Sequence, residues 1–83
     1  MLLYHERADR RTGALAAGDE EECFTSQGRK QGVWLTDESL DGETVVSADV
    51  PEDDALPYDV TTEGSSHRVF VVPAAVASGW GFA

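Results

Sequence analysis

Apolar and polar residues alternate over short runs in this chain, a pattern that predicts strands more often than helices. In the first run, Leu3 and His5 fall on one face of an extended segment, and Leu2 and Tyr4 fall on the other. Polar residues follow immediately. We therefore expect the chain to begin with a strand over residues 2–5.

Three further strands are expected later in the chain. Residues 33–36 and 44–50 are rich in β-branched and apolar side chains, and an Asp-Gly pair at 41–42 supplies a turn between them. Residues 68–72 carry apolar side chains on both faces, which is typical of a strand in the middle of a sheet. The pattern therefore predicts a sheet with one deeply buried strand.

Helical signals are short. Residues 9–17 begin with an aspartate suited to an N-cap and are followed by a glycine, which predicts a short helix. Residues 52–56 and 74–77 each follow a proline and predict single helical turns. The acidic run at 19–22 predicts a solvated loop or turn, and 23–31 a loop, with a short strand at its start as the alternative.

Length and composition limit the architecture. With 83 residues, of which 41% are hydrophobic, the chain suits one small domain over residues 1–83 with a modest core. Strands dominate and the helices are short. We therefore expect a small α+β domain with a single, mainly antiparallel sheet and one or two short helices.

The charge is uneven. The net charge is −10, and residues 31–83 carry ten acids against Arg68 alone, a net of −9. Such a field repels phosphate backbones, so we expect no direct nucleic-acid binding. It suits a protein partner with a basic surface or imitation of a phosphate array, and it also has the simpler explanation that acidic residues keep a small protein soluble.

Other features exclude whole classes of site. No apolar run approaches the ~20 residues of a membrane span, and the N-terminus is not a secretory signal, so we expect a cytoplasmic protein without membrane contact. Cys23 is the single cysteine, which excludes an intrachain disulfide, and acidic neighbours oppose a thiolate there. His5 and His67 match no metal-binding spacing. Scarce lysine with abundant Ala, Asp, Val, Gly and Arg suits a GC-rich source such as an actinobacterium or its phage.

The order of short motifs carries more information. A Leu-Tyr-His strand is followed by a short helix, then by Gly-Val-Trp-Leu-Thr-Asp at 32–37, and finally by a buried strand that ends in Val-Pro-Ala at 72–74. This order resembles short bacterial and phage ADP-ribosyltransferase-like domain proteins over nearly the whole chain. The resemblance implies a minimal version of the split sheet of that superfamily, with NAD as the possible cofactor.

The resemblance also implies site residues. The first-strand histidine of the family binds the NAD ribose, which points to His5, and the second strand contributes Thr36 as a hydroxyl and Trp34 as a stacking surface. The glutamate that orients the ribose falls at Val69, which has no carboxylate. A transferase needs that charge to stabilise its transition state, so no catalytic residue is assigned and NAD binding is left open. Glu63 and Glu38 are the nearest substitutes in sequence.

Each of these residues also has a structural explanation. We expect His5 to donate to a backbone carbonyl rather than to a ligand, and Trp34 to pack in the core or against a partner. Three functions follow from the residues and the resemblance. The first is a catalytically degenerate ADP-ribosyltransferase-like protein that binds a protein partner, as an inhibitor or phage accessory factor. The alternatives are an active NAD-dependent transferase or glycohydrolase, and an acidic nucleic-acid mimic.

Overall fold

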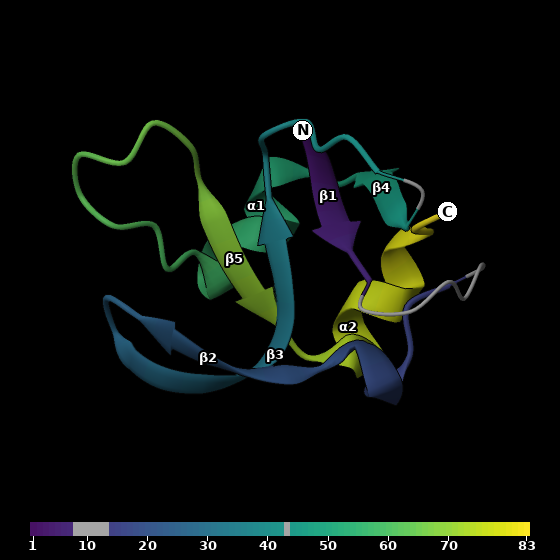
Figure 1. Ribbon diagram of the computed structural model, residues 1–83, viewed down its shortest axis with the longest axis horizontal. Helices are drawn as coiled ribbons and strands as arrows, with labels where there is room; N and C mark the ends of the chain where they lie inside the picture. Colours follow the sequence, from purple (N-terminus) through teal and green to yellow (C-terminus); the bar gives the residue numbers. More distant parts are fainter. Residues whose placement is uncertain (8–13, 43) are drawn as a thin grey trace.

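The computed structural model describes residues 1–7, 14–42 and 44–83 (Figure 1). Its five strands are β1 (Leu2–Glu6), β2 (Glu21–Thr25), β3 (Gly28–Thr36), β4 (Val45–Asp49) and β5 (Val69–Val72). Its two short helices are α1 (Glu52–Ala55) and α2 (Ala74–Ala77), and 3-10 turns lie at Ala17–Asp19, Leu56–Tyr58 and Ser78–Trp80. Among the residues described, no helix is long and apolar enough to cross a membrane.

The strands form one antiparallel sheet. β3 lies at its centre and pairs with β2, β5 and β1, and β4 pairs with the far edge of β1. β3 is curved, so that its first half pairs with β2 while its second half runs beside β5 (Figure 1). The expected small α+β domain with a mainly antiparallel sheet and short helices is confirmed.

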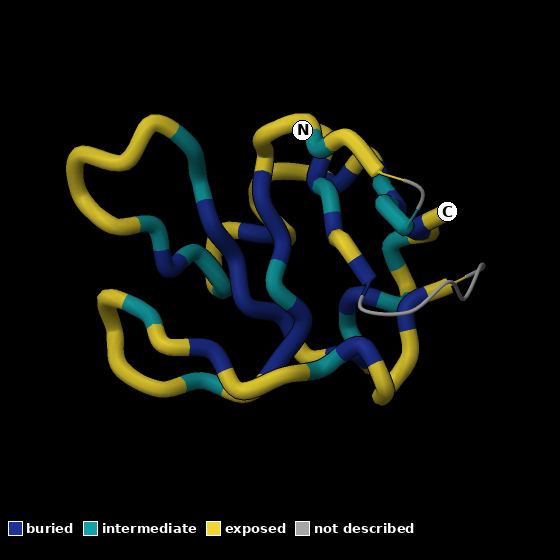
Figure 2. Tube along the Cα trace, viewed as in Figure 1, coloured by how far each residue is buried: buried dark blue, intermediate teal, exposed yellow. Residues whose placement is uncertain are grey.

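The two faces of the sheet bury different clusters. The main core lies on the face that α1 and α2 cover, and includes Leu3, Leu35 and Phe70. The second cluster lies on the opposite face and consists of Cys23, Val60, Val69 and Val71, with Trp34 packed against them. All four residues of β5 are buried, as expected from its apolar side chains on both faces. Figure 2 shows this burial running along β3 and β5, with exposed residues at the loop tips.

The segment expected to be a loop at residues 23–31 is instead most of a β-hairpin, and the alternative of a short strand at its start is confirmed, since residues 23–25 belong to β2. β2 and β3 pair in register from Glu21 opposite Gly32 to Thr25 opposite Gly28, so β3 begins five residues before the expected strand at 33–36. Gly28 supplies the left-handed turn conformation, with φ of 98°. The pattern was hard to recognise because Cys23 is the single buried residue of β2.

The predicted solvated loop at residues 19–22 is also wrong. Asp19 is buried, with 7% of its surface exposed, and Glu21 and Glu22 belong to β2. Glu20 reaches α2, where its Oε2 accepts a hydrogen bond from the Ala74 N–H at 2.7 Å. The acidic run therefore carries structural contacts because two of its carboxylates satisfy groups elsewhere in the chain.

The helix expected over residues 9–17 lies largely outside the described residues. Its described part, residues 14–17, is not α-helical, and the first local element is the 3-10 turn at Ala17–Asp19. The glycine expected to end the helix lies inside this turn. The later helices and strands fall where the sequence predicts them, at α1, α2, β4 and β5.

Gly32 allows β5 to approach the bend of β3. A Cβ atom on Gly32 would lie 2.8 Å from Val71 Cγ1 and 3.0 Å from the Val72 carbonyl oxygen, both shorter than ordinary contacts. We expect Gly32→Ala to lower the free energy of unfolding by about 1–3 kcal/mol, because β5 must shift to admit the methyl group.

Gly79→Ala is the matched control, since nothing lies within 4 Å of a Cβ there. Its effect is expected to stay within about 0.5 kcal/mol. Urea unfolding of both variants measures the difference, and an equal midpoint for Gly32→Ala and the parent would contradict the close approach.

Candidate functional site

The candidate site lies where β1 and β3 separate. β1 pairs with β4 along its whole length, but it pairs with β3 at one position, Tyr4 opposite Thr36. Beyond Tyr4 the two strands diverge. A pocket of about 270 Å³ occupies this seam. Its lining consists of Tyr4, His5, Glu6, Glu21, Trp34, Thr36 and Leu40.

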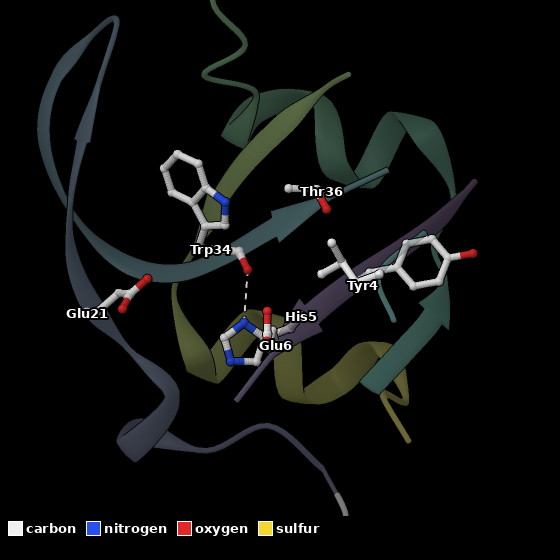
Figure 3. A pocket seen from close by; sticks show the side chains of 7 residues that line it. Tyr4, His5, Glu6, Glu21, Trp34 and Thr36 are labelled. Carbon is white, nitrogen blue, oxygen red and sulfur yellow. Dashed lines mark hydrogen bonds between the residues drawn. The ribbon is translucent and has the colours of Figure 1, made fainter. Parts of the chain in front are cut away.

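The three residues assigned to the site from the sequence meet at this pocket. Figure 3 shows Trp34 and Thr36 next to each other on β3, with His5 on β1. Trp34 is half-buried and packs on the second cluster, and the Thr36 hydroxyl donates to the Glu38 carbonyl at 3.4 Å. The structure thus brings His5, Trp34 and Thr36 to one pocket.

The His5 side chain forms a hydrogen bond with the backbone of β3. Its Nδ1 lies 2.9 Å from the Trp34 carbonyl oxygen, and because a carbonyl can only accept, Nδ1 carries the proton (Figure 3). Its Nε2 lies 3.7 Å from Asp19 Oδ1. The ring is therefore held by a hydrogen bond on its Nδ1 side, and 5% of the residue is exposed. The expected hydrogen bond to a backbone carbonyl is present.

A buried ion pair supports His5 from behind. Arg7 Nε donates to Asp19 Oδ1 at 3.1 Å, and both side chains are 1% exposed. Asp19 Oδ2 also accepts from the Ala16 N–H at 2.9 Å, and Arg7 Nη2 donates to the Ala14 carbonyl at 2.8 Å. The sequence reasoning did not single out Arg7 or Asp19, because nothing in a charged run distinguishes a buried charge from a solvated one.

Two carboxylates reach the pocket, and neither is one of the substitutes expected from the sequence. Glu6 is the last residue of β1, and Glu21 is the first residue of β2. Glu38 instead lies 3.7 Å from His67 Nδ1, and Glu63 sits in an exposed loop. Neither Glu38 nor Glu63 lines the pocket. Glu21 could not be found from the sequence because the hairpin that carries it was not predicted.

Val69 lies next to the site without entering it. It pairs with Thr36 across β3 and β5, on the same face of the sheet. Its side chain packs in the second cluster, and 7% of the surface of the residue is exposed. Position 69, where the resemblance would place a glutamate, therefore has an apolar side chain in apolar surroundings.

Comparison with known proteins gives no relative. No family model, curated protein or solved structure matches this chain. Any function must therefore be argued from the geometry of the pocket and from the chemistry of its lining.

Nucleophilic and metal chemistry find little support at this site. Burial, with a further contribution from the charge of Glu21, raises the pKa of the Cys23 thiol above its ordinary value, which disfavours the reactive thiolate. Cys23 is buried on β2 and does not belong to the pocket lining. Within the described ranges, no group of three or more His, Cys, Asp or Glu residues is arranged to hold a metal ion.

Proposed function

We propose that this chain is a non-catalytic binding domain that acts by contacting a protein partner with a basic surface. The observation that carries the proposal is the lining of the pocket, which contains two glutamates and neither lysine nor arginine. The net charge of −10 means that the molecule as a whole also attracts positively charged partners.

The same lining argues against NAD as the ligand. A dinucleotide carries a pyrophosphate, which proteins bind with backbone N–H groups at helix N-termini or with basic side chains. Glu6 and Glu21 would repel it. The volume of about 270 Å³ also falls below the ~300–1,000 Å³ usual for drug-sized ligands, and a dinucleotide is larger than these.

The resemblance to ADP-ribosyltransferase-like domains fits this proposal if the chain descends from such an enzyme and has kept its framework. The one-pair seam between β1 and β3 supports the expected split sheet, and it places His5 and Thr36 at one opening. Val69 supplies no carboxylate beside Thr36. We infer a framework of that kind whose catalytic group has been lost and whose opening has been adapted for binding.

An active NAD-dependent transferase or glycohydrolase is the second candidate. It is favoured by the position of Glu21 and Glu6 on the same pocket as His5 and Thr36, because a carboxylate beside the ribose is the group such chemistry requires. The lack of a cationic group in the lining makes it the weaker of the two.

Incubation with NAD labelled in its adenine half, together with basic acceptor proteins, distinguishes the candidates. The binding function predicts neither label transfer nor nicotinamide release. Activity that disappears in Glu21→Gln would overturn the proposal in favour of the enzyme. Activity that persists in Glu21→Gln would overturn it as well, since it would place catalysis on another group.

Binding itself is tested by capture on the immobilised chain at low and high salt. We expect retained proteins that are basic and that elute as salt screens the interaction. A double variant, Glu6→Gln with Glu21→Gln, is compared with Glu63→Gln with Asp53→Asn, which removes two exposed carboxylates outside the pocket. Equal losses in the two double variants would show that the pocket is not the contact.

A further inference from the structure

The arginines of the described residues pair with carboxylates outside the pocket. Asp19 pairs with Arg7, Glu22 with Arg29, and Glu52 and Asp59 with Arg68. Within the described part of the chain, Glu6 and Glu21 form no ion pair with a basic side chain. The described arginines are thus engaged elsewhere, and the two pocket carboxylates remain available to a cation from outside.

Aromatic rings accompany these carboxylates. The Trp34 indole and the Tyr4 ring both line the pocket, on opposite sides in Figure 3. Trp34 is held by its packing on the second cluster, so its ring is already positioned before any ligand arrives. An indole face attracts cations, and this attraction strengthens when water is excluded. Carboxylates and an aromatic face together favour an organic cation over a metal ion.

We propose that the pocket binds the side chain of an arginine presented by the protein partner. This inference rests on the proposed binding function and names the group that enters the site. The planar guanidinium can stack on the Trp34 ring while its N–H groups reach carboxylates that come from two strands, Glu6 on β1 and Glu21 on β2. The volume of about 270 Å³ accommodates one long side chain and little more.

Arginine fits this lining better than lysine does. An ammonium group is a compact, strongly hydrated charge, so it loses more hydration on entering the pocket and cannot stack on the ring as a planar group does. A guanidinium is planar, weakly hydrated and carries five N–H donors, so it can satisfy two separated carboxylates at once. The Thr36 hydroxyl, two residues along β3 from Trp34, adds an acceptor oxygen to the lining.

A titration with N-acetyl-arginine N-methylamide tests the assignment. Binding is monitored by two-dimensional ¹H–¹⁵N NMR. The indole N–H signal of Trp34 is expected to shift, and that of Trp80, which packs edge-on against Tyr58 away from the pocket, is the internal control. The citrulline analogue has nearly the same shape without the charge. We expect it to bind about tenfold more weakly or worse, because it loses the charge-assisted hydrogen bonds.

Charge-matched variants locate the site. Glu21→Gln is expected to weaken binding of the blocked arginine by about tenfold, because one charge-assisted hydrogen bond becomes neutral. Glu63→Gln removes the same charge from an exposed loop and is expected to leave binding unchanged. Both glutamates are exposed, so neither variant is expected to unfold the chain, which the dispersion of the spectrum verifies.

The outcomes separate this inference from the function on which it rests. Equal affinities for the blocked arginine, citrulline and lysine, or equal effects of the two variants, would overturn the arginine assignment. If basic partners are still captured in that case, the binding function stands and another surface carries it. Label transfer from NAD would instead overturn the binding function, whatever the arginine titration shows.

Discussion

Replacing Asp19 by alanine is expected to lower the free energy of unfolding by about 3–5 kcal/mol, because Arg7 loses the carboxylate that compensates its buried charge. The Ala16 N–H loses its acceptor in the same variant. A domain of 83 residues has a stability of roughly 4–12 kcal/mol in all, so this single change brings it close to unfolding. Urea unfolding followed by tryptophan fluorescence and circular dichroism measures the loss.

Asp49→Ala is the matched control for a surface ion pair. Asp49 contacts the N-terminal ammonium group at 3.1 Å, but its side chain is 82% exposed. Solvent screening limits that pair to less than about 1 kcal/mol. A third variant, Arg7→Met with Asp19→Leu, removes both buried charges and is expected to recover much of the stability. A loss in Asp19→Ala no greater than that in Asp49→Ala would contradict a stabilising role for the buried pair.

The carboxylates at residues 19–22 make different contacts that the sequence does not predict. Residues 19–22 read as one acidic run, yet Asp19 is buried on Arg7, Glu20 binds the first backbone N–H of α2, and Glu21 faces the pocket. These destinations depend on contacts with residues twelve or more positions away. Local composition cannot specify such contacts, and so the run was assigned to solvent.

The strands were predictable where their periodicity was strong. β5 is apolar at every position and is buried at every position, and β1 divides its side chains between two faces as expected. β2 was predicted only as the alternative of a short strand at residues 23–25, because Cys23 is the single residue that it buries and its exposed face carries Phe24, which is 75% exposed. The curvature of β3 around Gly32 was equally invisible in the sequence, since it results from pairing with two different strands.

The site was predictable in part for the same reason. His5, Trp34 and Thr36 lie on the strands that the pattern and the resemblance located, and they do meet at one pocket. The carboxylates of that pocket lie beyond those motifs, one at the end of β1 and one on the hairpin. Because these carboxylates decide which ligand charge the pocket favours, its chemistry depends on the part of the fold that the sequence did not reveal.

Placing a glutamate at position 69 is expected to destabilise the domain strongly and to create no activity toward NAD. Val69 packs with the apolar side chains of Val60, Val71 and Cys23. A carboxylate buried there favours its neutral form, so its pKa rises in the folded state. We expect Val69→Glu to lose about 3 kcal/mol or more at neutral pH, since burying an unpaired charge carries a large desolvation cost.

The loss should depend on pH in a direction that identifies its cause. The folded form of Val69→Glu holds its proton more tightly than the unfolded chain, so stability falls as pH rises above the ordinary glutamate pKa of about 4.3. The fall ends once the pH passes the raised folded pKa. Val69→Gln has nearly the same size and no titrating group, and its loss is expected to be independent of pH over the same range.

Val69→Glu also tests the binding function from a second direction. If the pocket takes a cation and not NAD, a glutamate beside Thr36 has no ribose to act on, and nicotinamide release should remain at the level of the buffer blank. The assay is run at the pH where urea unfolding shows the variant to be most stable, so that a folded protein is measured. Nicotinamide release by Val69→Glu and not by Val69→Gln would show that the seam still accepts NAD, and the assignment of the pocket to an arginine side chain would then be wrong.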